Sequence, residues 1–207
     1  MWSTMKKIIK VPFKKQVIDF SCFPAAVNAV LRFYGDEIDE RSLYRKSIIK
    51  GHGKGSFDVK ISQVLIKKGY DVTTFWNGFM EGSGLGKGAI RIYKKEYKKA
   101  LKKGMVHKRN ATISLIKKFI DKGIPVLTEV SAGKFYGTKA WWTHMIIVVG
   151  YDSKNFYVHD PDKYVGKKFK KITISKFRKC WEQISPLGVG RSMFVIVPKN
   201  GKLKLPK

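Results

Sequence analysis

Cysteine and histidine, the residue types that could supply a nucleophile and its base, are both scarce in this chain. Among 207 residues there are two cysteines, Cys22 and Cys180, and four histidines. Cys22 opens a segment, 22–35, in which apolar residues recur at helical spacing until a glycine ends the pattern. A cysteine in the first turn of a helix meets unpaired N–H groups and the positive end of the helix dipole, which favour the thiolate. Cys22 is therefore the candidate nucleophile.

A thiolate nucleophile needs a base and a third group that orients the base. His144 begins an apolar segment, 144–151, that is typical of a rigid buried strand, and such a strand is a good mount for a base. Asp160 lies sixteen residues on, and a hairpin through 152–154 would bring it beside His144. Its carboxylate could then hold the imidazole in one tautomer.

Gln16 lies six residues before Cys22 and completes a possible site. Its side-chain N–H and the backbone N–H of Cys22 could both donate to an oxyanion that forms on a substrate carbonyl. This chemistry needs no metal and no cofactor, and no group of histidines and cysteines has the spacing of a zinc site. The glycine-rich run 82–88 lacks the P-loop pattern and predicts no nucleotide site.

The remaining reactive side chains are expected to be structural. None of them begins a long apolar segment or follows a helix-capping pattern in the way that His144 and Cys22 do. They are Cys180 and Trp181 in the core, His52 in a glycine-rich loop, His107 in a basic segment and His159 as an exposed neighbour of Asp160.

The elements that would position these residues run from helices to strands along the chain. This order predicts the α+β class, with the helices, the nucleophile helix first, packed to one side of a mostly antiparallel C-terminal sheet. The predicted helices are 22–34, 40–50, 58–68, 93–104, 111–122 and 174–181, and the predicted strands are 6–13, 71–76, 126–130, 143–151, 155–159 and 192–197.

The length predicts a single domain, 1–207, and the glycine- and lysine-rich stretch 77–110 reads as a basic insertion. The chain carries 43 Lys and Arg against 15 Asp and Glu, a formal net charge of +28. Such a charge attracts anionic partners, nucleic acid or an acidic membrane surface, although lysine enrichment also serves solubility alone. The basic helix within the insertion could lie on such a partner or be a solvated surface helix.

The cellular compartment is expected to be the cytoplasm. Two cysteines do not make a disulfide framework, so they read as free thiols in a reducing environment. The first residues contain no apolar run of signal-peptide length, and no stretch is long and apolar enough to span a membrane.

Several short motifs occur in a characteristic order. After Gln16 and Cys22 come a helix that ends in Phe-Tyr-Gly, a Gly-Ile-Pro-Val strand, a His144-led strand that ends in Gly-Tyr-Asp, and Asp160-Pro. This pattern resembles the papain-like cysteine peptidases and, more narrowly, the bacteriocin-processing peptidases, which cut leader peptides after a double glycine. A later segment, 174–181, also resembles that family, and the resemblance covers about residues 11 to 197 apart from the insertion.

The resemblance implies a thiol hydrolase that acts on a peptide or protein substrate. By the resemblance, Cys22 is the nucleophile, His144 the base, Asp160 the orienting group and Gln16 the oxyanion donor. The membrane and ATPase regions of the transporter-linked members are missing from this chain, so bacteriocin export is not implied.

Two positions depart from the family pattern. Ser21 stands directly before the cysteine, where the family usually has Asp or Glu, and Phe23 follows it in place of Gly. The ring of Phe23 is expected near the site, where it would change substrate choice.

Two other functions stay open. The first is an acyl or aminoacyl transferase, because the thioester step is the same and only the acceptor differs. The second is a non-catalytic basic module that binds nucleic acid or another anionic partner, although a binding module has no need of the four site residues together.

Overall fold

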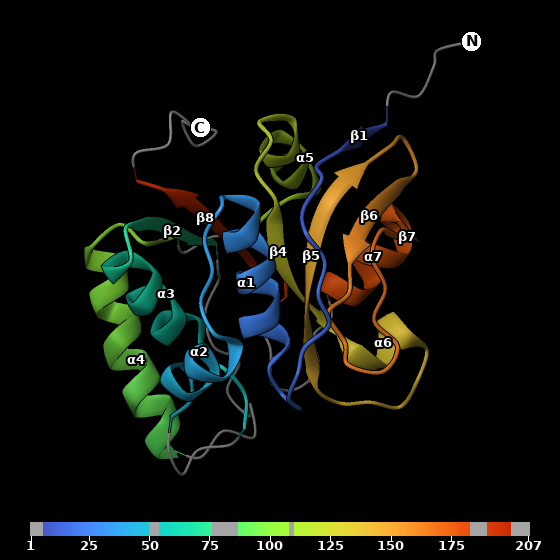
Figure 1. Ribbon diagram of the computed structural model, residues 1–207. Coiled ribbons are helices and arrows are strands. Elements are labelled where there is room, and N and C mark those ends of the chain that lie inside the picture. Colours follow the sequence, from blue (N-terminus) through green and yellow to red (C-terminus); the bar gives the residue numbers. More distant parts are fainter. Residues whose placement is uncertain (1–5, 50–53, 76–86, 108–109, 183–189, 200–207) are drawn as a thin grey trace.

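A mostly antiparallel sheet of eight strands organises the computed structural model, which describes residues 6–49, 54–75, 87–107, 110–182 and 190–199 (Figure 1). Seven strands follow the order β3-β2-β8-β4-β5-β6-β7, and β1 pairs with β5. The β2–β3 pair is parallel, and the other pairs are antiparallel. The strands are β1 (Lys7–Ile8), β2 (Tyr70–Phe75), β3 (Val106–His107), β4 (Val126–Ser131), β5 (Thr143–Tyr151), β6 (Asn155–His159), β7 (Lys170–Thr173) and β8 (Met193–Pro198).

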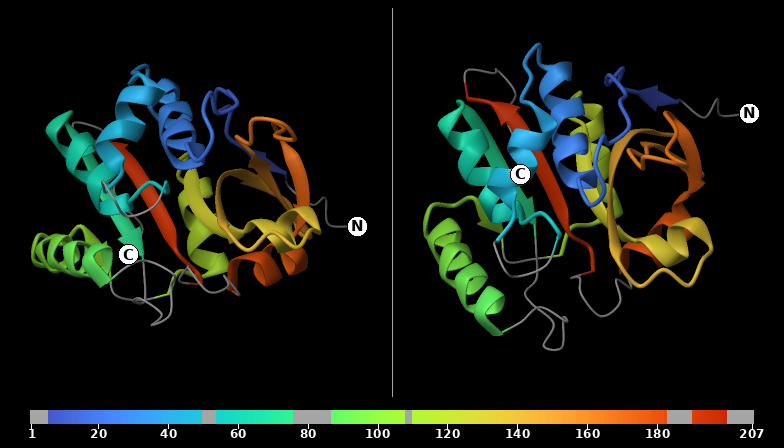
Figure 2. Two further views of the ribbon diagram at one scale, coloured as in Figure 1. Left: turned by 90° about the horizontal axis from the view of Figure 1, so that it is seen from below. Right: turned by 60° about the horizontal axis from the view of Figure 1, so that its bottom comes forward.

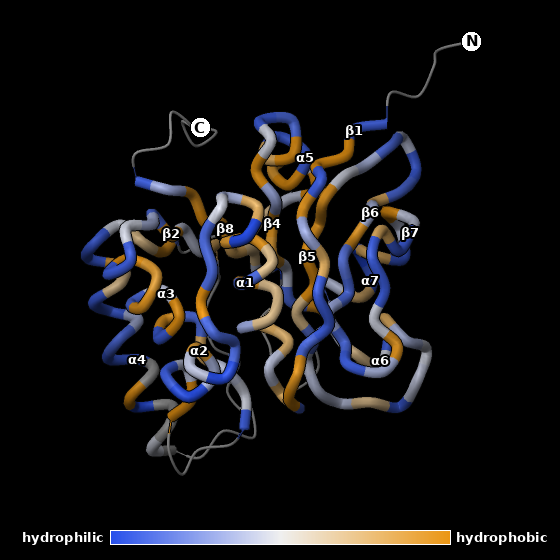
Figure 3. Tube along the Cα trace, in the orientation of Figure 1, coloured by the Kyte–Doolittle hydropathy of each residue, from blue (hydrophilic) through white to orange (hydrophobic). Residues whose placement is uncertain are grey.

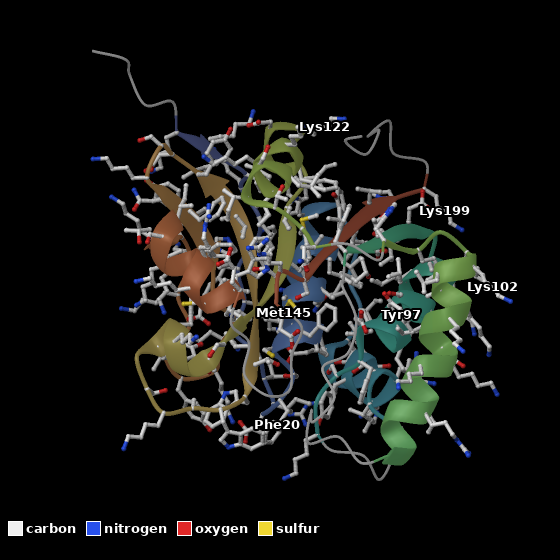
Figure 4. The ribbon with its side chains drawn as sticks, turned by 180° about the vertical axis from the view of Figure 1, so that it is seen from behind. Phe20, Tyr97, Lys102, Lys122, Met145 and Lys199 are labelled. Carbon is white, nitrogen blue, oxygen red and sulfur yellow. The ribbon has the colours of Figure 1, made fainter. Side chains whose placement is uncertain are left out.

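The helices lie on both faces of this sheet. The helix α1 packs against β5 on one face, and α7 lies on the opposite face, where it contacts β4, β6 and β7 (Figures 1 and 4). The α+β class is confirmed, but packing of all helices to one side is wrong, because β5 is apolar on both faces and needs cover on each. The helices are α1 (Cys22–Phe33), α2 (Glu40–Ser47), α3 (Asp58–Lys67), α4 (Lys87–Lys102), α5 (Ile113–Asp121), α6 (Ala132–Tyr136) and α7 (Ile174–Glu182).

The strand β5 and the helix α1 form the centre of the core. In Figure 3 the central strands are mostly hydrophobic, whereas the helices at the edge of the molecule carry much of the hydrophilic colour. Every residue of β5 from His144 to Gly150 is buried. Position 150 requires glycine because β1 lies close to it. A Cβ at Gly150 would lie 2.3 Å from the backbone oxygen of Lys7 in β1, so a side chain here would push β1 away.

Observed and predicted bounds agree best along the central hairpin. Both β5 and β6 begin and end where the sequence pattern placed them. The predicted strand 6–13 shrinks to β1. At the start of α7 the Thr173 hydroxyl accepts a hydrogen bond from the Lys176 N–H at 3.1 Å. Three short elements, β3, α6 and β7, were not predicted, because a two-residue strand, a five-residue helix and a lysine-rich four-residue strand show no clear apolar period.

Two arms of the molecule lie on either side of α1. The helices α2, α3 and α4 lie on one side, and the β5–β6 hairpin with α6 lies on the other (Figure 2). Of the predicted insertion, α4 buries Tyr97 and Ala100 next to α3, and β3 joins the sheet beside β2. His52 and the run 82–86 lie outside the described residues. None of the described helices is both long and apolar enough to cross a membrane.

Candidate active site

Cys22 is the first residue of α1, at the end of the molecule where α6 also lies (Figure 1). Ser21 is the N-cap residue, but its side chain makes no capping bond. Its hydroxyl instead lies 2.7 Å from the Ile18 carbonyl oxygen and 2.6 Å from Oε1 of Glu40. The first N–H groups of the helix are therefore left without a side-chain partner at the half-buried thiol of Cys22.

His144 and Asp160 form a buried pair beside this thiol. Nε2 of His144 lies 2.8 Å from Oδ1 of Asp160, and the two side chains are 5% and 0% exposed. The pair exists because β5 and β6 are antiparallel, so that the start of one strand lies near the end of the other. Cys22 is also close enough to His144 to raise the pKa of the imidazole.

Several groups besides His144 form hydrogen bonds or ion pairs with the Asp160 carboxylate. The Tyr136 hydroxyl donates to Oδ1 at 3.0 Å, the Asp162 N–H donates to Oδ1 at 3.2 Å, and Nζ of Lys170 lies 3.2 Å from Oδ2. The same ammonium lies 4.9 Å from the centre of the Tyr136 ring, and that ring is 5.6 Å from the His144 ring. Tyr136 and Lys170 thus hold the carboxylate in one position and pack around it.

The charges of the pair follow from these contacts. Burial alone would lower the pKa of His144, but the hydrogen bond to Asp160 and the interaction with Cys22 outweigh burial and raise the pKa to about 9. For Asp160, burial would raise the pKa, yet the contacts with His144, the Asp162 N–H and Lys170 lower it to about 2. The structure therefore favours a charged imidazolium next to a charged carboxylate near neutral pH.

Gln16 lies in the loop before α1 and is nine-tenths buried. Its backbone N–H donates to the Pro161 carbonyl at 2.7 Å, which ties the loop to the segment after Asp160. Its side-chain Nε2 donates to the Ile18 carbonyl at 3.0 Å. An amide nitrogen carries two hydrogens, so one remains for a substrate oxygen.

Glu40 is a buried carboxylate that the sequence did not single out. It is 4% exposed, and its Oε1 accepts the Val17 N–H at 2.8 Å as well as lying next to the Ser21 hydroxyl. Both contacts fall on the loop between Gln16 and Cys22. The acidic group that is absent at position 21 is thus supplied by α2 from the side.

Phe23 does not lie where it was expected. Its side chain is 6% exposed and packs edge-on against Phe194 of β8, with ring centres 5.0 Å apart. The reason is helical geometry, because the residue after the N-terminal cysteine turns toward the sheet rather than toward solvent. The expectation that Phe23 shapes substrate choice from the mouth of the site is therefore wrong.

His159 is also placed differently from the expectation. It is fully buried, not exposed, and its Nε2 lies 3.0 Å from the Val11 carbonyl while Nδ1 accepts the Phe169 N–H at 3.1 Å. Burial lowers its pKa, so the ring is neutral and structural. Cys180 is a buried free thiol and Trp181 a buried core residue, as expected.

The structure thus brings Cys22, His144 and Asp160 together at one end of the sheet, with Gln16 in the adjacent loop. His107 lies in β3, at the far edge of the sheet. No sequence signal marks Tyr136, Lys170 and Glu40, because one tyrosine, one of many lysines and a glutamate after a helix cap are all ordinary. Within the described part of the chain, no three His, Cys, Asp or Glu side chains gather as metal ligands.

Known proteins give this geometry a context. The model of the Peptidase_C39 like family matches residues 8–189. The peptidase domain of Streptococcus ComA, a bifunctional ABC transporter involved in a quorum-sensing pathway, is similar in structure at 16% identity and a TM-score of 0.56, over 93% of this chain and 98% of that one. No curated protein matches the sequence.

Two further solved structures share the fold. A C39-like peptidase from Bacillus anthracis matches at 18% identity and a TM-score of 0.54, over 93% of this chain and 98% of that one. A double glycine motif protease from an AMS/PCAT transporter, solved with a leader peptide, matches at 14% identity and a TM-score of 0.50, over 93% and 94%. These likenesses establish the papain-like fold, and the family match covers most of the chain, which confirms the expected resemblance and the expected enzyme class. The chain therefore belongs to the Peptidase_C39 like family, and it is a cysteine peptidase by that membership.

Proposed function

We propose that this protein cleaves peptide or amide bonds with Cys22 as the nucleophile, His144 as the base, Asp160 as the group that orients the base and Gln16 as an oxyanion donor. The observation that carries the proposal is the buried hydrogen-bonded pair of His144 and Asp160 next to the thiol of Cys22. A core built only for packing has no use for a charged pair beside a half-exposed thiol.

Each group then has a defined step. Before the substrate binds, His144 already holds the proton of the Cys22 thiol as an imidazolium, and the thiolate attacks the carbonyl carbon to give a tetrahedral oxyanion. The Cys22 N–H and the Gln16 amide donate to that oxygen. The imidazolium gives its proton to the departing amine, which leaves a thioester, and water activated by His144 hydrolyses the thioester to the acid and restores the thiol.

The contacts around Asp160 support this sequence of proton transfers. The base must exist as an imidazolium when the amine departs, and a pKa of about 9 keeps it protonated at neutral pH. Tyr136 and Lys170 keep the carboxylate ionised and fixed, so that the ring of His144 cannot turn away from the sulfur.

The proposed substrate class is a peptide or protein, and the proposed compartment is the cytoplasm. One structural neighbour is described in complex with a leader peptide, and a peptide substrate is the part of that description we extend to this chain. Both cysteines are free thiols, which is the form that the reducing cytoplasm maintains.

The test combines thiol labelling with peptide cleavage. Iodoacetamide should label Cys22 much faster than Cys180, and His144→Ala should remove most of the difference. A mixed peptide library, read by mass spectrometry, should show new termini with the wild-type protein and none with Cys22→Ala. Slow and equal labelling of both thiols, with no new termini, would contradict the proposal.

The same library distinguishes the two alternatives. An acyl transferase would give amide products in the presence of an added amine where a hydrolase gives acids. A basic binding module would cleave nothing, would bind nucleic acid with a steep salt dependence and would be unaffected by Cys22→Ser.

A further inference from the structure

Large apolar side chains are exposed almost entirely at one end of this molecule. Phe20, Trp141, Trp142, Tyr164 and Val165 each leave more than half of their surface in solvent, with values of 53%, 63%, 53%, 71% and 55%. We call these five residues the aromatic face. Among the described residues, the exposed large hydrophobic side chains that do not belong to it are less than two-fifths exposed. Exposed apolar residues that gather in one place mark an interaction surface.

The aromatic face comes from three loops that meet around the site. The loop before α1 is tied to the loop after Asp160, because Nζ of Lys15 donates to the Tyr164 carbonyl at 3.0 Å and Asp19 pairs with Lys163 at 3.6 Å. The third loop carries both tryptophans and leads directly into Thr143 and His144. Figure 4 shows Phe20 at the end of the molecule where α6 and the loop after it lie.

Phe20 is held outward by its backbone. Its φ of 65° is in the left-handed region, which strains a residue with a side chain and is usually taken by glycine. Position 20 lies two residues before Cys22, so the strained turn also sets the entry of the chain into α1. A bulky ring in such a turn, 53% exposed, has no packing reason inside the molecule.

Lysines surround the aromatic face. The three segments 14–20, 134–142 and 161–170 contain eight lysines and two aspartates. Two of the neighbouring ammonium groups lie over its rings, Lys54 at 5.3 Å from the Phe20 centre and Lys163 at 5.3 Å from the Tyr164 centre. One of the two aspartates is already paired with Lys163. Lys170 is likewise paired with Asp160, yet lysines still outnumber carboxylates around the exposed rings.

We infer that the aromatic face docks on an anionic lipid surface. Tryptophan and tyrosine favour the boundary between water and lipid, where an apolar ring and a polar edge are both satisfied, and lysines beside them attract acidic head groups. Side chains that line a groove are shielded by the opposite wall, whereas these five are each more than half exposed. Such exposed rings fit a soft, planar layer better than the closed surface of a folded partner.

The other lysine-rich surface of the molecule lacks this combination. On α4 the lysines at 94, 98 and 102 are exposed, but Tyr97 and Ala100 are buried against the body of the protein (Figure 4). The described apolar stripe of α4 is thus used for packing and cannot enter a membrane. Of the two surfaces, only the aromatic face offers both apolar and electrostatic contacts to lipid.

Docking in this way places Cys22 next to the lipid head groups. If the proposed function holds, the substrates are peptide segments that lie at or emerge from a membrane surface. The docking itself does not depend on catalysis, so it can be measured with Cys22→Ala, and failure of the proposed function would leave it intact.

The test is vesicle flotation of the full chain in the Cys22→Ala background. We expect binding to vesicles of equal parts phosphatidylglycerol and phosphatidylcholine and little binding to phosphatidylcholine alone. The double substitution Trp141→Ala/Trp142→Ala should weaken binding at least about tenfold. The matched control, Ile92→Ala, removes an exposed apolar side chain of α4 and should change binding less than about twofold.

A second pair of variants separates a local surface from total charge. Two double variants change the net charge by the same amount. One is Lys139→Glu/Lys167→Glu in the loops that carry the aromatic face, and the other is Lys98→Glu/Lys102→Glu on α4. We expect the first pair to weaken binding roughly 30-fold and the second pair much less. Equal weakening by both pairs, with no effect of the tryptophan variants, would overturn the inference in favour of diffuse attraction. Absence of vesicle binding, with slower peptide cleavage by the tryptophan variants in the active protein, would make the face a substrate surface instead.

Discussion

His144 and His159 are buried histidines on neighbouring strands, yet their surroundings have opposite effects. His144 contacts a carboxylate and a thiol, and its pKa is raised to about 9. His159 exchanges hydrogen bonds only with backbone groups, and burial lowers its pKa. Burial by itself favours the neutral ring in both cases, so the charge of the partner decides whether an imidazolium can form.

The comparison separates a site for chemistry from a site for structure. At His144 the ring bridges two ionisable side chains at the start of a strand, where a substrate can reach the thiol. At His159 the ring joins the N-terminal segment to the loop before β7, through the Val11 carbonyl and the Phe169 N–H. Loss of the first ring should therefore remove activity, and loss of the second should remove stability.

Alanine at each histidine is the strongest test. We expect His144→Ala to lower kcat/KM about 10⁴-fold or more in protein that still folds. His159→Ala should lower the free energy of unfolding by about 2 to 5 kcal/mol, because two buried backbone groups lose their partners, with activity per folded molecule preserved. Peptide cleavage and urea unfolding of both variants measure the two effects. A His159→Ala protein that is folded but inactive would contradict the assignment of His159 to a structural role.

Asp160→Asn removes the charge that distinguishes the two environments. We expect kcat/KM to fall about 10³- to 10⁴-fold. The wild-type rate should decline as the pH rises through about 9, where the imidazolium loses its proton, and in the variant this decline should move to lower pH because the carboxylate no longer raises the pKa. Asp121→Asn, at a carboxylate bonded to Tyr151 away from the site, is the control and should leave the profile in place.

Gln16→Ala tests the oxyanion donor rather than the base. We expect kcat/KM to fall about 100- to 1000-fold. Alkylation of Cys22 by iodoacetamide forms no oxyanion, so its rate should change little. The matched control is Gln63→Ala in α3, whose amide donates to Glu96 at 2.6 Å. Equal losses in cleavage and alkylation would mean that Gln16 acts on the loop and not on the substrate.

Tyr136→Phe should have a smaller effect. The lost hydroxyl is a positioning group for Asp160, and a hydrogen bond to a charged group is worth about 1.5 to 3 kcal/mol, so we expect a fall in kcat of about tenfold. Tyr151→Phe removes a comparable bond, at 2.7 Å to Asp121, and should not change kcat. A change in melting temperature without any change in kcat or its pH profile would assign Tyr136 a structural role alone.

The two histidines should also give opposite pH effects on stability. The raised pKa of His144 contributes stability that is present below about 6.5 and is lost as the pH rises through about 9. The lowered pKa of His159 contributes stability that is present above about 6.5 and is lost as the pH falls through its folded value. For each histidine, the free energy of unfolding should change by at most about 1.4 kcal/mol per pH unit. Urea unfolding of His159→Gln should therefore lack the loss of stability at acidic pH that we assign to His159.

Much of the secondary structure followed from local patterns. Asp39 is of a type that commonly caps helices, and its Oδ1 accepts the Ser42 N–H at 2.7 Å at the start of α2. The hairpin β5–β6 has the predicted bounds, because an alternation of apolar strand, polar turn and apolar strand is a local signal. Residues in such elements have neighbours close in sequence, which is why their positions could be anticipated.

The supporting groups of the site could not be anticipated in the same way. Glu40, Tyr136 and Lys170 reach the site from α2, α6 and β7, and the last two elements were not predicted. Phe23 and His159 were misplaced because exposure depends on which neighbour covers a side chain, and those neighbours are Phe194 and the segment around Val11. Long-range packing leaves no trace in a local pattern.

The sequence alone was sufficient to select Cys22, His144, Asp160 and Gln16, because spacing, helix-start chemistry and the order of motifs lie along the chain. Their catalytic roles stay a prediction that the proposed experiments test. Only the tertiary structure decided which histidine carries a charge and which lysine-rich surface carries exposed aromatic rings. The physical reason is that desolvation and Coulomb interactions depend on distance in space, and the folded chain sets those distances.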